Sequence, residues 1–279
     1  MNNVIPILLS ICFFITCQAK AQTQAQADTR TLSFPKVEVK NVKIPNKKKV
    51  WVFILAGQSN MAGRGLVEPQ DTIPSPRILT INKQGEIILA KEPLHFYEPT
   101  LTGLDCGLSF AKAMLPHVPK GVSILLIPTA VGGSAISHWL NDVIYKNMHL
   151  LTNFKEKVVI AKQYGQLKGI LWHQGESDAN SRDIPEYSHR LTKLFTEFRT
   201  SAGNEKLPIM MGELGSYSSN KQDWLRINEQ IKQYAAADSH AIVVSTADFI
   251  DKGDKIHFNS EGQRILGQRF AEAYLRSIE

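Results

Sequence analysis

The chain has 279 residues, 43% of them hydrophobic, which is enough apolar material for one large domain with an ordinary core. The formal net charge of +6 lies entirely in residues 1–49, where eight Lys or Arg face two Asp or Glu, so the remainder of the chain sums to zero. The folded body therefore lacks the basic excess of a nucleic-acid-binding protein, and we expect no nucleic-acid partner.

The first 21 residues have the character of a signal peptide. An apolar run at residues 4–17 is too short to span a bilayer comfortably. It is followed by Ala19 and Ala21, small residues at the positions that precede a cleavage site. We expect export to the periplasm or the medium, with no stable membrane insertion after cleavage. An uncleaved anchor is one alternative, and lipidation at Cys17, with Thr16 a poor match to the motif, is another.

Cleavage leaves a mature chain with one cysteine, Cys106, because Cys12 and Cys17 lie in the leader. This excludes an intramolecular disulfide and a cysteine metal cluster. Residues 22–49 form a polar and basic N-terminal arm, whose lysines we expect to be solvated and flexible. The domain that carries function is predicted at residues 50–279.

Short apolar runs follow one another in chain order from residue 50. None alternates between apolar and polar residues, which is typical of strands buried on both faces of a parallel sheet. These predicted strands are residues 50–56, 122–128, 167–173, 208–214 and 241–246.

Between the runs, apolar residues recur at helical spacing. Stripes at 108–115, 187–198 and 224–234 predict three helices, and a last helix begins at Asn259 or Ser260 and continues to near the C-terminus. The proline-rich residues 64–104 are expected to form an irregular excursion over the substrate face. The alternation predicts one doubly wound α/β domain with a mainly five-stranded parallel sheet.

Glycines and polar residues follow these strands along the chain. Ligands of open parallel sheets bind beyond the carboxyl ends of the strands, so the residues that follow each strand are candidates for one shared site. In chain order they are Ser59, Gly132, Gly133, Gln174, Glu176, Asp254 and His257.

Three of these residues make up a possible catalytic relay. Serine is a weak nucleophile unless a base takes its proton, and the base needs an acid to orient it. Asp254 precedes His257 by three residues, so it can bind one ring nitrogen while the other faces Ser59. The alternative is that Asp254 and His257 only cap the last helix.

An ester-cleaving serine also requires donors for the developing oxyanion. The candidates are the backbone N–H of Ser59, that of Gly132 or Gly133, and the side-chain amide of Gln174. The glycines could instead form only a tight turn.

The residues of the glycine-rich segment exclude two other interpretations, a phosphate-binding loop and the nucleophile elbow of an α/β-hydrolase. Residues 57–65, GQSNMAGRG, match neither phosphate-binding pattern, G-x-x-x-x-G-K-[ST] or G-x-G-x-x-G. The nucleophile elbow of α/β-hydrolases, G-x-S-x-G, requires glycine where Met61 stands.

Four blocks in this order resemble the SGNH hydrolase superfamily. They are GQSNMAGRG at 57–65, GGS at 132–134, WHQGESD at 172–178 and DKIHFN at 254–259. More narrowly they are similar to its sialate O-acetylesterase-like branch, which includes the acetylxylan esterases of carbohydrate esterase family 6. The resemblance implies a three-layer α/β/α sandwich with Ser59 as nucleophile, His257 as base and Asp254 as its partner. The second-block glycine and Gln174 would complete the oxyanion hole, and Glu176 would have a supporting role.

The activity that the resemblance implies is removal of O-acetyl groups from carbohydrate, either acetylated xylan-type saccharides or O-acetylated sialic acid. It needs no metal or organic cofactor. Arg64, His138 and Trp139 are possible pocket residues, although Trp139 could equally pack in the core and Arg64 could hold a loop. The alternatives are a lysophospholipase, thioesterase or arylesterase with the same catalytic residues, or a non-catalytic carbohydrate-binding protein.

Overall fold

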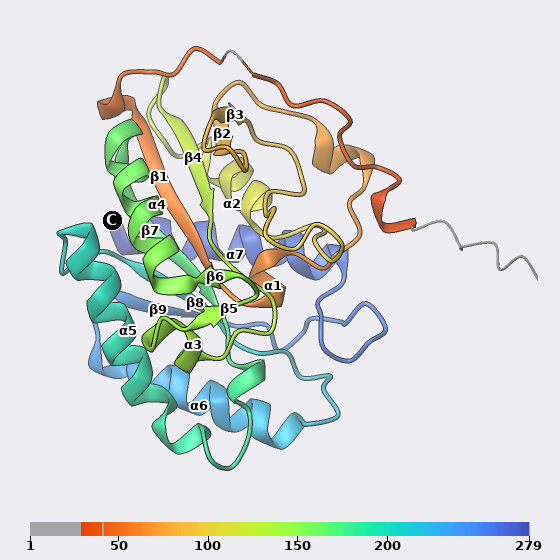
Figure 1. Ribbon diagram of the computed structural model, residues 1–279, viewed down its shortest axis with the longest axis vertical. Coiled ribbons are helices and arrows are strands. Elements are labelled where there is room, and N and C mark those ends of the chain that lie inside the picture. Colours follow the sequence, from red (N-terminus) through yellow and green to blue (C-terminus); the bar gives the residue numbers. More distant parts are fainter. Residues whose placement is uncertain (1–28, 41, 279) are drawn as a thin grey trace, which may run out of the picture.

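The computed structural model describes residues 29–40 and 42–278 and contains all five predicted strands (Figure 1). They lie side by side and parallel in the central sheet. Their bounds are β1 (Val50–Gly57), β4 (Ser123–Pro128), β7 (Gln166–His173), β8 (Ile209–Gly212) and β9 (Ala241–Val244).

The sheet is wider than predicted, because two further strands extend it beside β4. β2 (Ile78–Ile81) pairs parallel with β4, and β3 (Ile87–Leu89) pairs antiparallel with β2 at the edge. The strand order is β3-β2-β4-β1-β7-β8-β9, so the sheet has seven strands. Both additional strands lie within the proline-rich residues 64–104, for which we expected only irregular structure. The two strands contain no proline themselves, but they are short and prolines flank them.

The helices include every one predicted from the apolar stripes. The structure adds α4, a crossover helix in which Leu151, Phe154, Val158 and Ala161 face the core. The α-helices are α1 (Ser59–Ala62), α2 (Gly107–Met114), α3 (Ile136–Leu140), α4 (Leu150–Tyr164), α5 (Tyr187–Ala202), α6 (Lys221–Ala237) and α7 (Ser260–Ile278). Short elements complete the described chain: the hairpin β5 (Ile144–Tyr145) and β6 (Met148–His149), and the 3-10 turns Thr29–Thr31, Lys47–Lys49, Pro69–Thr72, Glu176–Asp178 and Ile184–Glu186.

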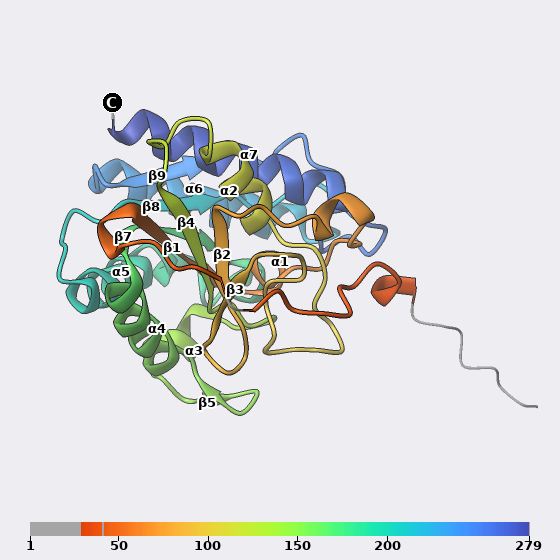
Figure 2. The same cartoon turned by 90° about the horizontal axis from the view of Figure 1, so that it is seen from above.

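Helices cover both faces of the sheet, which confirms the three-layer sandwich. α3, α4, α5 and α6 pack on one face, and α2 and α7 pack on the other, as Figure 2 shows for α4 and α5 against α2 and α7. Strand β1 illustrates why the strand sequences do not alternate. Val52 and Ile54 point into the first core while Phe53 and Leu55 point into the second, so both faces of the strand are apolar.

The described part of the N-terminal arm packs against the body rather than extending freely. The carbonyl of Val39 accepts a hydrogen bond from the N–H of Leu89 on the edge strand β3 (3.2 Å), and that of Val37 accepts from Lys91 Nζ (2.7 Å). The lysines of this arm, the triplet 47–49 among them, are nevertheless exposed. The predicted leader, residues 1–21, lies outside the described residues.

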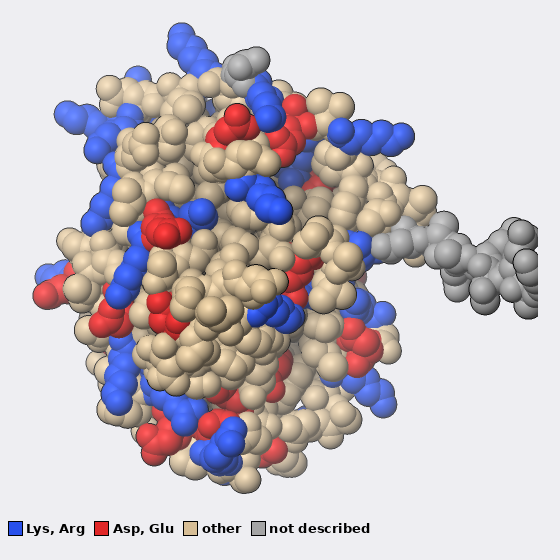
Figure 3. Space-filling model, viewed as in Figure 1, with Lys and Arg blue, Asp and Glu red and all other residues tan. Residues whose placement is uncertain are grey.

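The surface in Figure 3 carries Lys and Arg interspersed with Asp and Glu on the face that the figure shows. Among the described residues, every helix is too short or too polar to cross a membrane.

Candidate active site

The ends of β1, β4 and β7 meet at one point, and backbone hydrogen bonds join them there. The N–H of Gln58 donates to the carbonyl of His173 (2.9 Å), and that of Val131 donates to the carbonyl of Gly57 (3.2 Å). Gly57 has a φ of 136°, and a Cβ at this position would lie 2.1 Å from the His173 carbonyl oxygen. The chain can leave β1 this close to β7 only with glycine at position 57.

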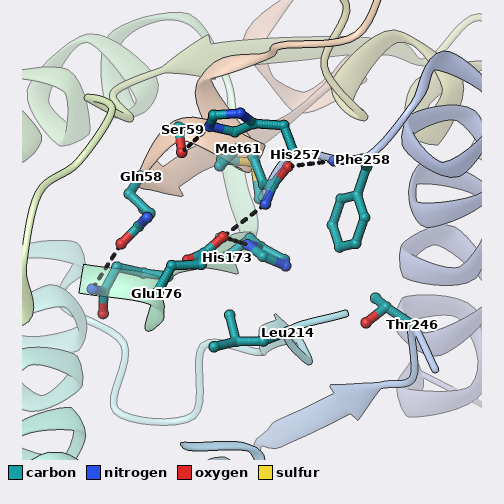
Figure 4. A network of polar contacts seen from close by, with 12 residues as sticks. Gln58, Ser59, Met61, His173, Glu176, Leu214, Thr246, His257 and Phe258 are labelled. Atoms are coloured by element: carbon teal, nitrogen blue, oxygen red, sulfur yellow. Dashed lines mark hydrogen bonds and ion pairs between the residues drawn. The ribbon is translucent and has the colours of Figure 1, made fainter. Parts of the chain in front are cut away.

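The predicted relay of serine, histidine and aspartate is assembled at this point. Ser59 is the first residue of α1, and its Oγ lies 3.0 Å from Nε2 of His257. The Nδ1 of His257 lies 2.7 Å from Oδ2 of Asp254. A carboxylate can only accept, so it favours the tautomer with hydrogen on Nδ1, which leaves Nε2 free to accept from the Ser59 hydroxyl. Figure 4 shows the Ser59 side chain pointing to the ring of His257.

Asp254 is fixed by the loop that carries it. Its Oδ1 accepts from the backbone N–H groups of Ile256 (3.0 Å) and His257 (2.8 Å). Partial burial would by itself raise the pKa of Asp254, but the hydrogen bonds from the His257 ring and from these two N–H groups lower it to about 2. The aspartate is therefore charged at neutral pH, as a partner for an imidazolium must be.

The relay opens into a pocket of about 610 Å³. Ser59 is almost fully buried at its base, while Asp254 is partly exposed at the rim. The lining residues are Arg30, Gln58, Ser59, Arg64, Thr100, Leu101, Gly132, Gly133, Lys146, Glu176, Ser177, Lys252, Asp254, Ile256 and His257. The described residues include no group of three or more His, Cys, Asp or Glu side chains placed to hold a metal ion.

Both predicted glycines line this pocket, but their N–H groups differ in availability. The N–H of Gly132 donates to Oε2 of Glu98 at 2.6 Å, so a carboxylate already occupies it. The N–H groups of Gly133 and Ser59 have no acceptor within the described part of the chain. Of the two glycines, Gly133 is thus the one whose N–H can receive an oxyanion.

The structure does not bring Gln174 to the pocket, contrary to the prediction. Its side chain is fully buried, and Nε2 lies within hydrogen-bond distance of Gln58 Oε1 (3.1 Å), the Ser134 carbonyl (3.1 Å) and Asp178 Oδ2 (2.6 Å). Its Oε1 accepts from the hydroxyl of Tyr187 (2.8 Å). The amide therefore ties the loops after β1, β4 and β7 together from inside, and the pocket is lined by Glu176 and Ser177 instead.

Two of the three possible pocket residues also lie elsewhere. Trp139 is fully buried against Trp172 and Phe198, and its Nε1 donates to Ser134 Oγ (3.1 Å). His138 accepts the N–H of Ala135 through Nδ1 (3.1 Å) and so caps α3. Both residues lie on α3, after the glycine loop, and their side chains stabilise that loop rather than line the pocket.

Arg64 does line the pocket, and it does so within an ion-pair cluster that sequence reasoning missed. Its Nη2 contacts Glu98 Oε2 (2.8 Å), and Lys146 Nζ contacts Glu98 Oε1 (2.6 Å). Lys146 also donates to the carbonyl of Gly132 (2.7 Å). Burial would raise the pKa of Glu98, but the hydrogen bond from Lys146 and the charge and hydrogen bond of Arg64 lower it to about 2. Glu98 lies in the proline-rich segment and Lys146 on the β5–β6 turn, and neither gives a sequence signal.

Comparison with known proteins agrees with this geometry. A family model described as carbohydrate esterase, sialic acid-specific acetylesterase, matches residues 49–276. A probable carbohydrate esterase of Arabidopsis thaliana is 28% identical over 264 residues, which cover 87% of this chain and 95% of the relative.

Solved structures share the fold. The crystal structure of an Arabidopsis thaliana protein matches with a TM-score of 0.72 at 28% identity, over 81% of this chain and 98% of that one. NanS matches with a TM-score of 0.65 at 21% identity, over 84% and 98% of the two chains. A carbohydrate acetylesterase from Xanthomonas citri matches at 0.60 and 18% identity, over 81% of this chain and 55% of that one. The last two likenesses concern the fold alone.

Proposed function

Because the chain belongs to the carbohydrate esterase family of sialic acid-specific acetylesterases, we propose that it removes acetyl groups from an O-acetylated sugar with Ser59 as the nucleophile. The observation that carries this proposal is the continuous relay from Asp254 through His257 to the Ser59 hydroxyl at the base of an open pocket. A non-catalytic carbohydrate-binding protein would have no need of this geometry.

The relay supports a two-step acyl transfer. Ser59 Oγ attacks the carbonyl carbon of the acetyl ester while His257 Nε2 takes the hydroxyl proton. The sugar alcohol then leaves with that proton, and the acetyl group stays on Ser59. Water, deprotonated by the same nitrogen, attacks the acetyl-enzyme and releases acetic acid. The Asp254 carboxylate stabilises the imidazolium that exists in each step.

The oxyanion of each tetrahedral intermediate needs donors that are not already used. We assign this role to the N–H of Ser59, at the first turn of α1, and to the N–H of Gly133. Helix N-termini leave such N–H groups without intrahelical partners, so they are available to a developing charge. Gly132 contributes by shape, since a Cβ there would meet Arg64 Nη2 at 2.1 Å.

The lining of the pocket favours a sugar that carries a carboxylate, such as O-acetylated sialic acid, over a neutral xylan. Lys146 and Lys252 line the pocket with partly exposed ammonium groups, each also paired with a carboxylate, Glu98 or Asp254. Apart from His257, the described lining contains no aromatic side chain on which a neutral sugar ring could stack. Charge recognition is therefore the main chemistry that the pocket offers to a sugar.

Acetate release from a panel of esters tests the proposal. O-acetyl sialic acids should be cleaved faster than acetylated xylan, with a thioester and a lysophospholipid as controls for the rival esterase activities. Ser59→Ala should abolish release. If this variant keeps its activity, Ser59 is not the nucleophile. If the thioester or phospholipid is the best substrate, the sugar assignment is wrong.

A further inference from the structure

The residue after the nucleophile, Asn60, turns its side chain away from the pocket and into the loop that carries His257. Asn60 is fully buried. Its Oδ1 accepts from the backbone N–H of Phe258 (3.0 Å), and its Nδ2 donates to the carbonyl of Ile256 (3.2 Å). One amide group thus holds the two peptide groups on either side of the catalytic histidine.

A third hydrogen bond fixes the direction of this amide. Nδ2 of Asn60 also donates to Oε1 of Glu176 (2.7 Å), which lies after β7. Rotating the amide by half a turn would set its NH₂ against the Phe258 N–H and its oxygen against two acceptors. The amide therefore has one favourable orientation.

Glu176 lies beside the buried ring of His173 but is not hydrogen-bonded to it. Nε2 of His173 donates to the carbonyl of Glu213 at the end of β8 (2.9 Å), so Nδ1, which lies 3.6 Å from Oε1 of Glu176, carries a lone pair and has no hydrogen-bond partner among the described residues. His173 is fully buried, and burial lowers its pKa, so the ring is neutral at neutral pH. Figure 4 shows the carboxylate of Glu176 beside the ring of His173, below the segment that carries His257 and Phe258. Glu176 stands three residues after the end of β7, so its hydrogen bond with Asn60 connects the sheet edge to the histidine loop.

The histidine loop needs this connection because its own hydrogen bonds are local. The N–H of Lys252 donates to the His257 carbonyl (2.9 Å), and that of Asn259 donates to the Ile250 carbonyl (3.1 Å). Such bonds fix the shape of the loop but not its place relative to Ser59. Other contacts across are the hydrogen bond of His257 with Ser59 itself (3.0 Å), a long one from the Tyr217 hydroxyl to the Ile256 carbonyl (3.4 Å), and the packing of the buried Phe258 ring on His173. Of these, only the bonds of Asn60 act on both peptide groups that flank His257.

We propose that Asn60 is the positioning residue of the catalytic histidine and that Glu176 acts on catalysis only through Asn60. The proposal rests on the proposed function, since it takes His257 to be the base. It gives Glu176 a defined role: Glu176 orients the Asn60 amide, whereas Asp254 alone supplies the negative charge that His257 meets.

Steady-state kinetics of the full chain test this assignment, with acetate release as the readout. Asn60→Ala removes both contacts to the loop, and kcat should fall by about 100-fold, the usual cost of a misplacement of about 1 Å, with KM unchanged. Glu176→Gln keeps an oxygen for Asn60 Nδ2, so it should lower kcat far less than Asn60→Ala does and should not shift the acid limb of the pH profile, which reports His257. If Glu176 were instead the charge partner of His257, Glu176→Gln would lower both kcat and the pKa of the histidine.

An isosteric variant covers the case in which Asn60→Ala fails to fold. Asn60→Asp keeps the acceptor for Phe258 N–H but sets a second carboxylate oxygen against Glu176. The two carboxyl groups can lie within hydrogen-bond distance only if they share a proton. The variant should therefore lose activity as pH rises through a range in which the parent stays active. The other titratable groups near Glu176 are His173, Tyr187 and Tyr217. Burial and the nearby carboxylates raise the pKa of both tyrosines, so these phenols stay neutral over the pH range of the assay.

Ser59→Ala in the same series separates the two claims. An active Ser59→Ala overturns the proposed function and this inference with it. If Ser59→Ala is inactive while Asn60→Ala and Asn60→Asp retain the parent kcat and pH profile, only the positioning role is refuted. A Glu176→Gln variant as impaired as one that lacks Asp254 would likewise refute it.

Discussion

On one side of the pocket a neutral amide, Asn60, holds the loop that carries His257; on the other a carboxylate, Glu98, holds the loop that carries Gly132 and Gly133. The amide uses hydrogen bonds of fixed direction and is fully buried. The carboxylate instead balances two cations, Arg64 and Lys146.

This difference matches what each side has to do. The acid–base side must hold one ring nitrogen within hydrogen-bond distance of a hydroxyl, which is a requirement on direction. The oxyanion side must keep a backbone turn rigid beside developing negative charge, and the two cations keep that neighbourhood from being negative overall. Mutations on the first side should therefore change rate, and mutations on the second should change stability and its dependence on pH.

The largest effect is expected for Asp254→Asn. The amide oxygen can still accept from the N–H groups of Ile256 and His257, but its NH₂ would face Nδ1 of the ring. The histidine would then carry its hydrogen on Nε2, and kcat should fall by roughly 10⁴-fold. Asp251→Asn is the matched control, because Asp251 caps the same loop through the N–H groups of Gly253 and Lys255 without touching the ring. A comparable fall in kcat in both variants would show that Asp254 acts through the shape of the loop and not through the tautomer of His257.

The sequence predicted the acid–base side far better than the oxyanion side, for a physical reason. Ser59 comes two residues after β1, whose apolar run is readable because both faces of the strand are covered, and the Asp254–His257 pair is recognisable by its own three-residue spacing in the loop between β9 and α7. Glu98 comes from a segment without periodicity, so nothing in the sequence could place it beside Gly132. The prediction that Gln174 lines the pocket was wrong for a different reason. The position of a residue after a strand places it at the edge of the sheet, but does not tell which of several successive side chains points into the pocket and which into the core.

The same limits apply to the fold. The strands β1, β4, β7, β8 and β9 and the amphipathic helices were predicted because their patterns repeat over several residues. β2 and β3 are four and three residues long and are flanked by prolines, so the pattern was too short to distinguish them from a loop. The family resemblance rested on the blocks at the strand ends, and the match over residues 49–276 confirms it.

The next largest effect should be on stability, from Glu98→Ala. The substitution leaves the nearly buried guanidinium of Arg64 without its counter-charge, and breaking a buried pair costs about 3–5 kcal/mol. We expect the lower end, because Lys146 is partly exposed and can be hydrated. Glu86→Ala is the control, since its pair with Lys40 is fully exposed to solvent and should contribute much less to stability. Denaturant unfolding measures both, and equal losses would contradict the contrast.

The ionisation of Glu98 should also be visible when the free energy of unfolding is measured as a function of pH in the acid range. The pKa of Glu98 is lowered from 4.5 to about 2 in the folded protein, so the folded state binds its proton less readily than the unfolded chain. Its contribution is fully present above pH 4.5 and is lost as pH falls toward 2. The parent should therefore lose more stability over this range than Glu98→Ala does. Unfolding free energies that run parallel in the two proteins would mean that Glu98 does not titrate in this way.

The smallest effect should come from His138→Ala, which tests how far the oxyanion side extends. His138 accepts the N–H of Ala135 and stacks on Tyr145 at 4.3 Å between ring centroids, so its loss removes a helix cap worth about 1 kcal/mol. It lies outside the pocket lining, so KM for the acetylated sugar should not change. Lys146→Ala offers the contrast, because its ammonium does line the pocket, and its loss should raise KM for a carboxylate-bearing sugar. A rise in KM in His138→Ala equal to that in Lys146→Ala would show that bound sugar reaches α3 and that the pocket extends further along the sheet edge than its described lining.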